Sequence, residues 1–243
     1  MHHTLTIAKR ELSSLFYSPV AYLVLAVFAF VSSGLFAAQT FFPGAPAEMR
    51  LLFQWMVWLL VFLVPAISMR LISEELRSGT IETLMTSPIK DMHVVLGKWL
   101  GGLAFYLILL SPLVVHVLVL SFTARPGLDY GPVATGFMGL VLVGGLYLAI
   151  GLALSATTDS QLIAFMLTVL AVGMLSIGMA LLATQIQGMP LPLQQALHYA
   201  NVHRQFEDFS KGLIDTSNFV YFVSGIGLFL FLAVLILQSK RWR

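Results

Sequence analysis

Residues 130–158 read YGPVATGFMGLVLVGGLYLAIGLALSATT, a stretch that contains no Asp, Glu, Lys or Arg. A helix rises about 1.5 Å per residue, so about 20 apolar residues cross the roughly 30 Å hydrocarbon core of a bilayer. The stretch exceeds that length and is continuously apolar, whereas a barrel strand needs about 10 alternating residues. It therefore predicts a membrane-spanning helix.

Five further uncharged runs of spanning length accompany this one along the chain. Trimming all six runs at their Pro, Gly and polar residues predicts helices near residues 20–42, 51–69, 99–122, 131–157, 162–183 and 218–238. The predicted fold class is an all-α membrane protein with six transmembrane helices. The whole chain, residues 1–243, is expected to form one transmembrane domain.

The composition agrees with this class and excludes others. Hydrophobic residues make up 58% of the chain and charged residues 10%, whereas soluble domains carry about 25% charged residues. A water-soluble enzyme is therefore excluded. The absence of cysteine excludes disulfides, cysteine metal sites and a thiol nucleophile. The numbers of positive and negative residues are nearly equal, with a net charge of +2, which does not suggest a nucleic-acid partner. Membrane lipid is the expected surrounding.

Lys and Arg residues are distributed unequally between the two sets of loops. With a cytoplasmic N-terminus, nine fall inside and four outside, the four being Arg50, Arg125, Arg204 and Lys211. Short cytoplasmic loops carry an excess of Lys and Arg, so both termini are predicted to be cytoplasmic. The apolar run after Pro19 is too long for the signal-peptide core of about 7–15 residues. The first helix is therefore expected to remain in the mature chain.

The predicted spans contain no Asp, Glu, Lys or Arg, and His116 is their one histidine. Ion-coupled carriers and intramembrane enzymes place such groups at depth because their mechanisms use them, so both classes are disfavoured. His116 is expected to be a neutral side chain hydrogen-bonded to a neighbouring helix. The fragment Gly97-Lys98-Trp99 lacks the first glycine and the hydroxyl residue of a P-loop. No catalytic, cofactor or metal site is predicted in this chain.

Small residues at four-residue spacing, Gly145, Ala149 and Ala153, line one face of the fourth span. Such a face lets another helix approach closely. Packing within one chain and packing across a dimer explain it equally well.

The N-terminal residues 4–16 predict an interfacial helix. Leu5, Ala8, Leu12 and Leu15 share one face of it, as in helices that lie on a membrane surface. Ile7 falls off that face, which leaves an ordinary cytoplasmic leader as the alternative.

The loop 70–98 holds eight of the 24 charged residues. Arg70 and Glu74 form an i,i+4 pair, and the helix that carries them is expected to break at Gly79. Thr80 is predicted to cap a short helix with Glu82 in its first turn. Asp91 is expected to cap the next helix, which continues through Gly97 into the third span.

The short helix has an apolar face formed by Ile81, Leu84 and Met85, and Ser87-Pro88 ends it. A helix of two turns is not stable alone, so its apolar face is expected to pack against a partner. Docking to a protein and lying on the membrane are equally consistent with the pattern.

Glu75 to Pro88, followed by Gly97-Lys98, resembles the segment E-x-x-x-G-T-x-E-x-L-x-x-[ST]-P…GK of ABC-2 type transporter permeases. In that family the segment is the coupling helix, which sits in a groove of an ABC ATP-binding subunit. The resemblance implies that ATP and Mg are bound by that partner. It assigns to ATPase coupling Glu75, Gly79, Thr80, Ile81, Glu82, Leu84, Met85, Ser87 and Pro88.

Residues 206–215 and the ending 239–243 resemble the gliding-motility-type branch of the family. In the family the outer segment between the fifth and sixth spans forms hairpin helices that gate the exit. The resemblance therefore implies an outer gate at Phe206, Glu207, Asp208 and Phe209. An exposed interfacial loop is the alternative.

The function that follows is the permease subunit of an ABC-2 exporter in the bacterial inner membrane. The resemblance implies a type V exporter-like fold and a homodimer that works with two copies of a separate ATPase. The alternative is a force-transmitting or assembly subunit that moves no solute and acts on an auxiliary envelope protein. The residues do not specify a substrate.

Overall fold

The computed structural model describes residues 2–40, 48–80, 90–123, 127–179, 181–182 and 190–241. Every regular element within these residues is a helix. The segments long and apolar enough to cross a membrane are Pro19–Thr40, Arg50–Ser78, Asp91–Thr123, Tyr130–Ser155, Gln161–Gly178 and Thr216–Lys240. The prediction of an all-α membrane protein with six transmembrane helices is therefore confirmed.

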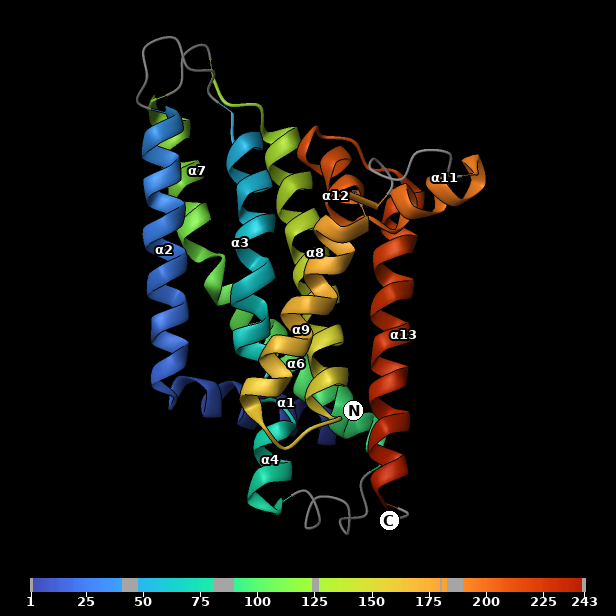
Figure 1. The fold of residues 1–243 in the computed structure, drawn as a ribbon. Coiled ribbons are helices and arrows are strands. Elements are labelled where there is room, and N and C mark those ends of the chain that lie inside the picture. Colours follow the sequence, from blue (N-terminus) through green and yellow to red (C-terminus); the bar gives the residue numbers. More distant parts are fainter. Residues whose placement is uncertain are drawn as a thin grey trace.

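The six spans stand side by side as a bundle, with shorter helices at its two ends (Figure 1). The α-helices are α1 (His2–Phe16), α2 (Pro19–Thr40), α3 (Arg50–Ser68), α4 (Ser73–Ser78), α6 (Asp91–Leu109), α7 (Ser111–Thr123), α8 (Tyr130–Ser155), α9 (Gln161–Gly173), α11 (Leu191–Ala200), α12 (Val202–Ser210) and α13 (Thr216–Arg241). A π-helical turn, η1 (Met174–Gly178), directly follows α9.

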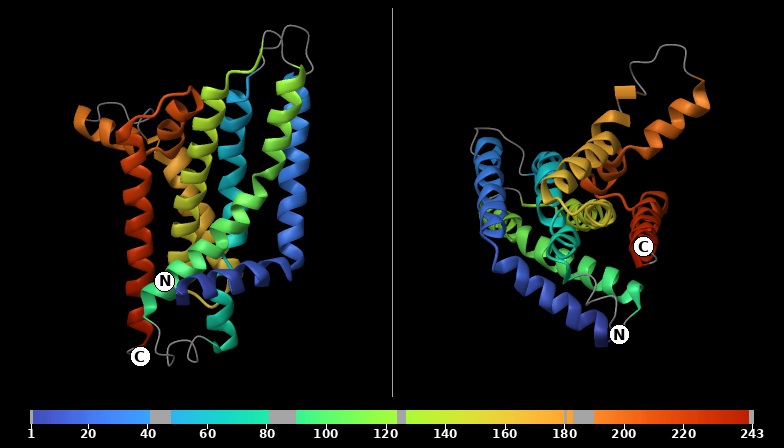
Figure 2. Two further views of the ribbon diagram at one scale, coloured as in Figure 1. Left: turned by 180° about the vertical axis from the view of Figure 1, so that it is seen from behind. Right: turned by 60° about the horizontal axis from the view of Figure 1, so that its bottom comes forward.

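Helix α1 lies across one end of the bundle, and α4 extends from the same end (Figures 1 and 2). The N-terminus and the C-terminal end of α13 are also there. Helices α11 and α12 lie at the opposite end. We call the end with α1 and α4 the base and the opposite end, with α11 and α12, the outer end.

The third span begins earlier than residue 99, the predicted start. Helix α6 starts at Asp91 with Lys90 as its N-cap, so Asp91 is the first helical residue and not the expected cap. The span is interrupted at Leu110, between α6 and α7. Pro112 accounts for this break, because proline lacks an N–H and its ring clashes with the carbonyl four residues earlier.

Helix α8 is the most buried span and packs against α3, α6, α9, α12 and α13. Glycines allow this close packing. A Cβ atom added at Gly144 would lie 2.2 Å from Cζ of Tyr106 on α6. The hydroxyl of Tyr106 donates to the carbonyl of Leu140, 2.7 Å away, so the ring both fills the glycine gap and ties the two helices together.

The small-residue stripe on α8 is covered within the chain. Ala149 and Ala153 are buried in one cluster with Ala233 of α13, and a Cβ atom added at Gly145 would lie 3.2 Å from Cδ1 of Ile226. Of the two explanations that the sequence left open, packing within one chain therefore holds.

His116 on α7 contacts α2. Its Nε2 lies 3.1 Å from Oγ of Ser33, and its ring stacks on Phe36 with the centroids 4.6 Å apart. The expectation of a histidine hydrogen-bonded to a neighbouring helix is confirmed.

Substituting Gly144 by alanine tests the glycine gap on α8. We expect Gly144→Ala to lower stability by about 1–3 kcal/mol, because the added methyl group overpacks the contact with Tyr106. Gly227→Ala on α13 is the matched control, since a Cβ atom there meets no atom within 4 Å. It should leave stability unchanged or raise it by up to about 1 kcal/mol. Thermal unfolding in detergent measures both, and equal effects would contradict the prediction.

Candidate functional site

At the base of the bundle, α1 packs directly on the backbone of α6. A Cβ atom added at Gly97 would lie 2.7 Å from Cβ of Ile7, and one at Gly101 would lie 2.7 Å from Cβ of Glu11. The two glycines thus form a groove in which α1 lies.

The predicted interfacial helix at residues 4–16 exists as α1, but its predicted apolar face is wrong in part. Leu5 is 64% exposed, whereas Leu15 is buried. Ile7, which lies off that face, contacts α6. The glycine groove and the charge on Glu11 select the packed face, and neither is visible in the hydrophobic spacing of α1 alone.

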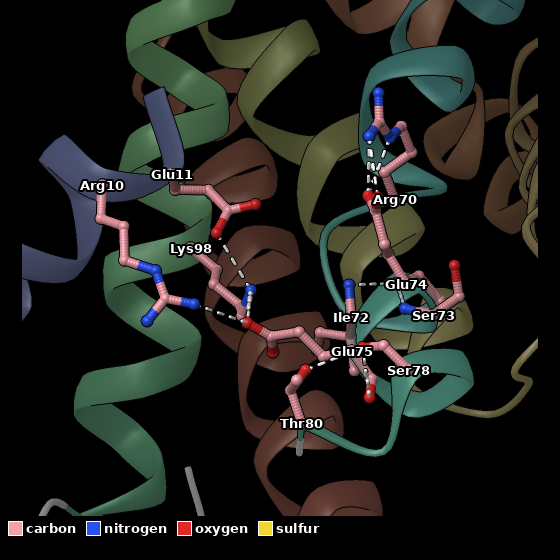
Figure 3. A network of polar contacts seen from close by, with 11 residues as sticks. Arg10, Glu11, Arg70, Ile72, Ser73, Glu74, Glu75, Ser78, Thr80 and Lys98 are labelled. Atoms are coloured by element: carbon pink, nitrogen blue, oxygen red, sulfur yellow. Dashed lines mark hydrogen bonds and ion pairs between the residues drawn. The ribbon is translucent and has the colours of Figure 1, made fainter. Parts of the chain in front are cut away.

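Lys98 is a buried cation in α6, with a side chain only 3% exposed. Its Nζ lies 3.0 Å from Oε2 of Glu11 on α1 and 2.9 Å from Oε1 of Glu75 on α4. Figure 3 shows the three side chains converging from these helices. Arg10 lies 3.7 Å from the same Glu75 oxygen. We call Glu11, Glu75 and Lys98 the base cluster.

The electrostatics of the base cluster explain why it holds three helices together. A buried charge costs several kcal/mol in desolvation unless partners compensate it, and two carboxylates flank this ammonium. Burial raises the pKa of the Glu11 carboxyl, and the Lys98 ammonium only partly offsets that rise. Moving α1 or α4 away would leave Lys98 with one partner fewer.

The turn between α3 and α4 is fixed to α8. Oγ of Ser155 accepts hydrogen bonds from the backbone N–H of Ile72, at 2.9 Å, and of Ser73, at 3.2 Å. The Arg70 guanidinium donates to both carboxylate oxygens of Glu74, each at 2.9 Å, which confirms the i,i+4 pair. These contacts surround the start of α4 (Figure 3).

Helix α4 ends at Gly79, as the sequence predicted. Gly79 has φ of 70° and caps α4 in the left-handed conformation, which glycine adopts without the steric cost that a Cβ atom brings. The hydroxyls of Ser78 and Thr80 lie 2.8 Å apart directly beside it. The chain therefore turns sharply as it leaves α4.

The structure describes three residues of the predicted coupling segment, namely Glu75, Gly79 and Thr80. The other predicted coupling residues lie outside the described residues, and they are Ile81, Glu82, Leu84, Met85, Ser87 and Pro88. The Glu75 side chain is 13% exposed and is directed at Lys98. It therefore anchors α4 internally instead of presenting its carboxylate on the surface.

At the outer end, residues 191–210 form α11 and α12 and not the exposed loop that was the alternative. Asn201 joins them: its Oδ1 accepts from the N–H of Arg204 at 2.9 Å. Its Nδ2 donates to the carbonyl of Ser176 in η1, also at 2.9 Å. One asparagine thus caps α12 and attaches it to the end of the fifth span.

The predicted outer-gate residues divide into two pairs. Phe206 and Phe209 are fully buried and pack against Gly139 of α8. Glu207 forms ion pairs with Lys211, at 2.7 Å, and Arg50, at 3.8 Å. The hydrogen bond from Lys211 lowers the pKa of Glu207.

Asp208 accepts a hydrogen bond from Nδ2 of Asn218, 2.8 Å away. The structure therefore does not gather the four predicted gate residues around one opening. The phenylalanines pack α12 onto α8, and the two acids connect α12 to α3 and α13. Their role as a gate stays a prediction.

The sequence interpretation missed Glu11 and Lys98 as partners, because it counted Lys98 among the charges of the cytoplasmic connection 70–98, just outside the predicted span 99–122. A signal was present: Lys98 stands within Val94-Val95-Leu96-Gly97-Lys98-Trp99-Leu100-Gly101-Gly102. A lone charge in an apolar stretch is costly without a partner. No comparable feature of the sequence indicated Glu11 as the partner of Lys98, since α1 and α6 are far apart in sequence.

Comparison with known proteins gives one positive result. The sequence model of a family described as ABC-2 family transporter protein matches residues 5–238. This match includes the base cluster, the first five spans and all but the last two residues of the sixth. A search among curated proteins found no match.

Replacing Lys98 by methionine tests the base cluster. We expect Lys98→Met to destabilise the protein by about 3–5 kcal/mol, because it leaves two carboxylates buried without their cation. Lys211→Met is the matched control: its ion pair with Glu207 is about one-third exposed and should contribute at most about 1 kcal/mol. Thermal unfolding in detergent compares the two variants.

A rescue variant separates charge from packing. Adding Glu11→Gln and Glu75→Gln to Lys98→Met removes the unpaired carboxylates and should restore much of the lost stability. An equal loss in the single and triple variants would contradict the electrostatic explanation.

Proposed function

The chain belongs to the ABC-2 transporter family, and from this premise we propose that it is the permease subunit of an exporter driven by a separate ATPase. Family membership implies an ABC ATP-binding partner, which would bind ATP and Mg. This chain would then supply the transmembrane path and receive the conformational change. We also propose that the chain belongs to the gliding-motility-type branch and that it works as a homodimer with two copies of the ATPase.

The observation that carries the proposal is the attachment of α4 to the bundle. Helix α4 leads directly into the predicted coupling segment, and Glu75 binds it to Lys98 of α6. Ser155 of α8 holds the turn before it. A helix held in this way transmits a displacement as a rigid-body movement and not as local bending.

The arrangement of the two ends supports the proposed orientation. Both termini lie at the same end as α4 (Figure 1). The excess of Lys and Arg in the loops and the coupling segment therefore both favour a cytoplasmic position for this end. We place the chain in a bacterial inner membrane, with α11 and α12 facing outward toward any auxiliary envelope protein.

A double substitution in the coupling segment tests the docking of the ATPase. We expect Glu82→Arg with Leu84→Asp to abolish copurification with an ABC ATPase encoded beside this chain. The substitutions reverse a charge and place another on the predicted apolar face. Membrane insertion and thermal stability of the permease should stay the same.

Glu48→Arg with Leu213→Asp is the matched control, because it makes the same kinds of change at exposed positions of the outer end. It should retain the ATPase. Undiminished copurification of the ATPase by the Glu82 and Leu84 variant would sink the docking proposal.

A further inference from the structure

A polar hollow of about 580 Å³ opens at the outer end, between α11, α12 and the start of α13. The side chains used below are Gln195 and His198 of α11, Arg204 and Asp208 of α12, and Asn218 of α13, and all of them line it. They offer a cation, amides and an imidazole around one space. The hollow therefore suits a polar ligand that accepts hydrogen bonds.

The cation of this hollow, Arg204, can bind a phosphate. Arg204 is exposed, and no ion pair to its guanidinium is formed by the residues that the structure describes. Asp208, the carboxylate of the lining, is engaged by Asn218 at 2.8 Å. A planar guanidinium binds phosphate oxygens in a bidentate manner, and Gln195 can add an amide donor.

An apolar hollow of about 550 Å³ lies beside the polar one. Its walls are Leu146 of α8, Leu175 of η1, and Tyr221, Leu228 and Phe229 of α13. Apolar side chains dominate it, and most of them come from helices that belong to the membrane-spanning segments. It suits an alkyl chain.

Two tyrosines in contact lie at the boundary between the hollows. Tyr199 lines the polar hollow and Tyr221 the apolar one, and their rings meet edge to face with centroids 5.7 Å apart. The hydroxyl of Tyr221 donates to the carbonyl of Ala200, 2.8 Å away. Amphipathic rings of this kind concentrate where headgroups meet hydrocarbon.

The order of the two hollows along α13 matches the order of groups in a lipid. Asn218 lines the polar hollow and Phe229 the far part of the apolar one, and this separation corresponds to about 16 Å of helix. That length equals about half of the roughly 30 Å hydrocarbon core. A headgroup at Arg204 would thus leave an acyl chain within the outer leaflet.

We infer that the two hollows form one binding site for a phosphate-bearing amphiphile of the outer leaflet. The phosphodiester lies against Arg204 and Gln195, and one acyl chain follows α13 past Leu228. The inference rests on the proposed membrane orientation, which decides the leaflet, but it concerns binding alone and does not depend on the proposed coupling to an ATPase. Free phosphate shares the headgroup chemistry but makes no use of the apolar hollow.

Native mass spectrometry of the purified full chain tests this site with three probes. These are phosphatidylglycerol, monoglucosyl diacylglycerol with the same acyl chains, and glycerol phosphate. We expect phosphatidylglycerol to bind at least about tenfold more tightly than either other probe, because it alone carries both groups. Equal binding of the glucosyl lipid would overturn the role of the phosphate, and equal binding of glycerol phosphate would overturn the role of the chain.

Two variants locate the site. Arg204→Gln and Leu228→Trp should each weaken phosphatidylglycerol binding about tenfold, the first by removing the guanidinium and the second by filling the apolar hollow. Lys211→Gln, at the same end as Arg204, and Leu232→Trp, on the same helix as Leu228, are the matched controls. Neither Lys211 nor Leu232 lines either hollow, so both controls should bind phosphatidylglycerol within about twofold of the unaltered chain. Unchanged binding by both site variants would overturn the inference, and the probe comparison on the unaltered chain does not depend on their folding.

Discussion

The buried ammonium of Lys98 is the constraint on which the base of this protein depends. A charge in a low-dielectric interior needs a partner at short range, because its desolvation penalty exceeds the Coulomb attraction to distant charges. Two carboxylates supply it here, one from α1 and one from α4, and both contact the same Nζ of Lys98. One side chain therefore holds α1, α4 and α6 at fixed relative positions. This cluster could not persist if any of the three helices moved independently.

Close packing by glycine is the second constraint, and it acts together with the first. Gly97 and Gly101 let α1 approach the backbone of α6, which brings Glu11 within hydrogen-bond distance of Lys98. On α8, Gly144 accepts the ring of Tyr106 and Gly139 accepts Phe206. Between membrane helices there is little hydrophobic driving force, so van der Waals contact and internal hydrogen bonds decide the arrangement. Large side chains at these four positions would separate the helices that the polar contacts join.

The sequence predicted the features that depend on neighbours along the chain. The six spans follow from uncharged length, the end of α4 follows from Gly79, and the Arg70–Glu74 pair follows from helical spacing. It did not predict contacts between distant segments: Glu11 and Lys98 are 87 positions apart, and the packed face of α1 depends on glycines in α6. The burial of Phe206 and Phe209 illustrates the same limit, since both stand beside the acidic residues Glu207 and Asp208 in the sequence, yet they pack against α8. Periodicity describes one helix, whereas the partner of each face is a property of the fold.

Helix α8 connects the two ends of the molecule through groups at its own ends. At the base, Ser155 accepts hydrogen bonds from the turn that precedes α4. At the outer end, the hydroxyl of Thr135 donates to the carbonyl of Phe209 on α12, 2.7 Å away. Thr135 and Ser155 are 20 positions apart, which corresponds to about 30 Å of helix, and within the bilayer a helix satisfies its backbone groups internally. The turn before α4 and helix α12 are therefore both hydrogen-bonded to α8, and α12 is also packed on it, so one helix supports the structure at both ends of the molecule.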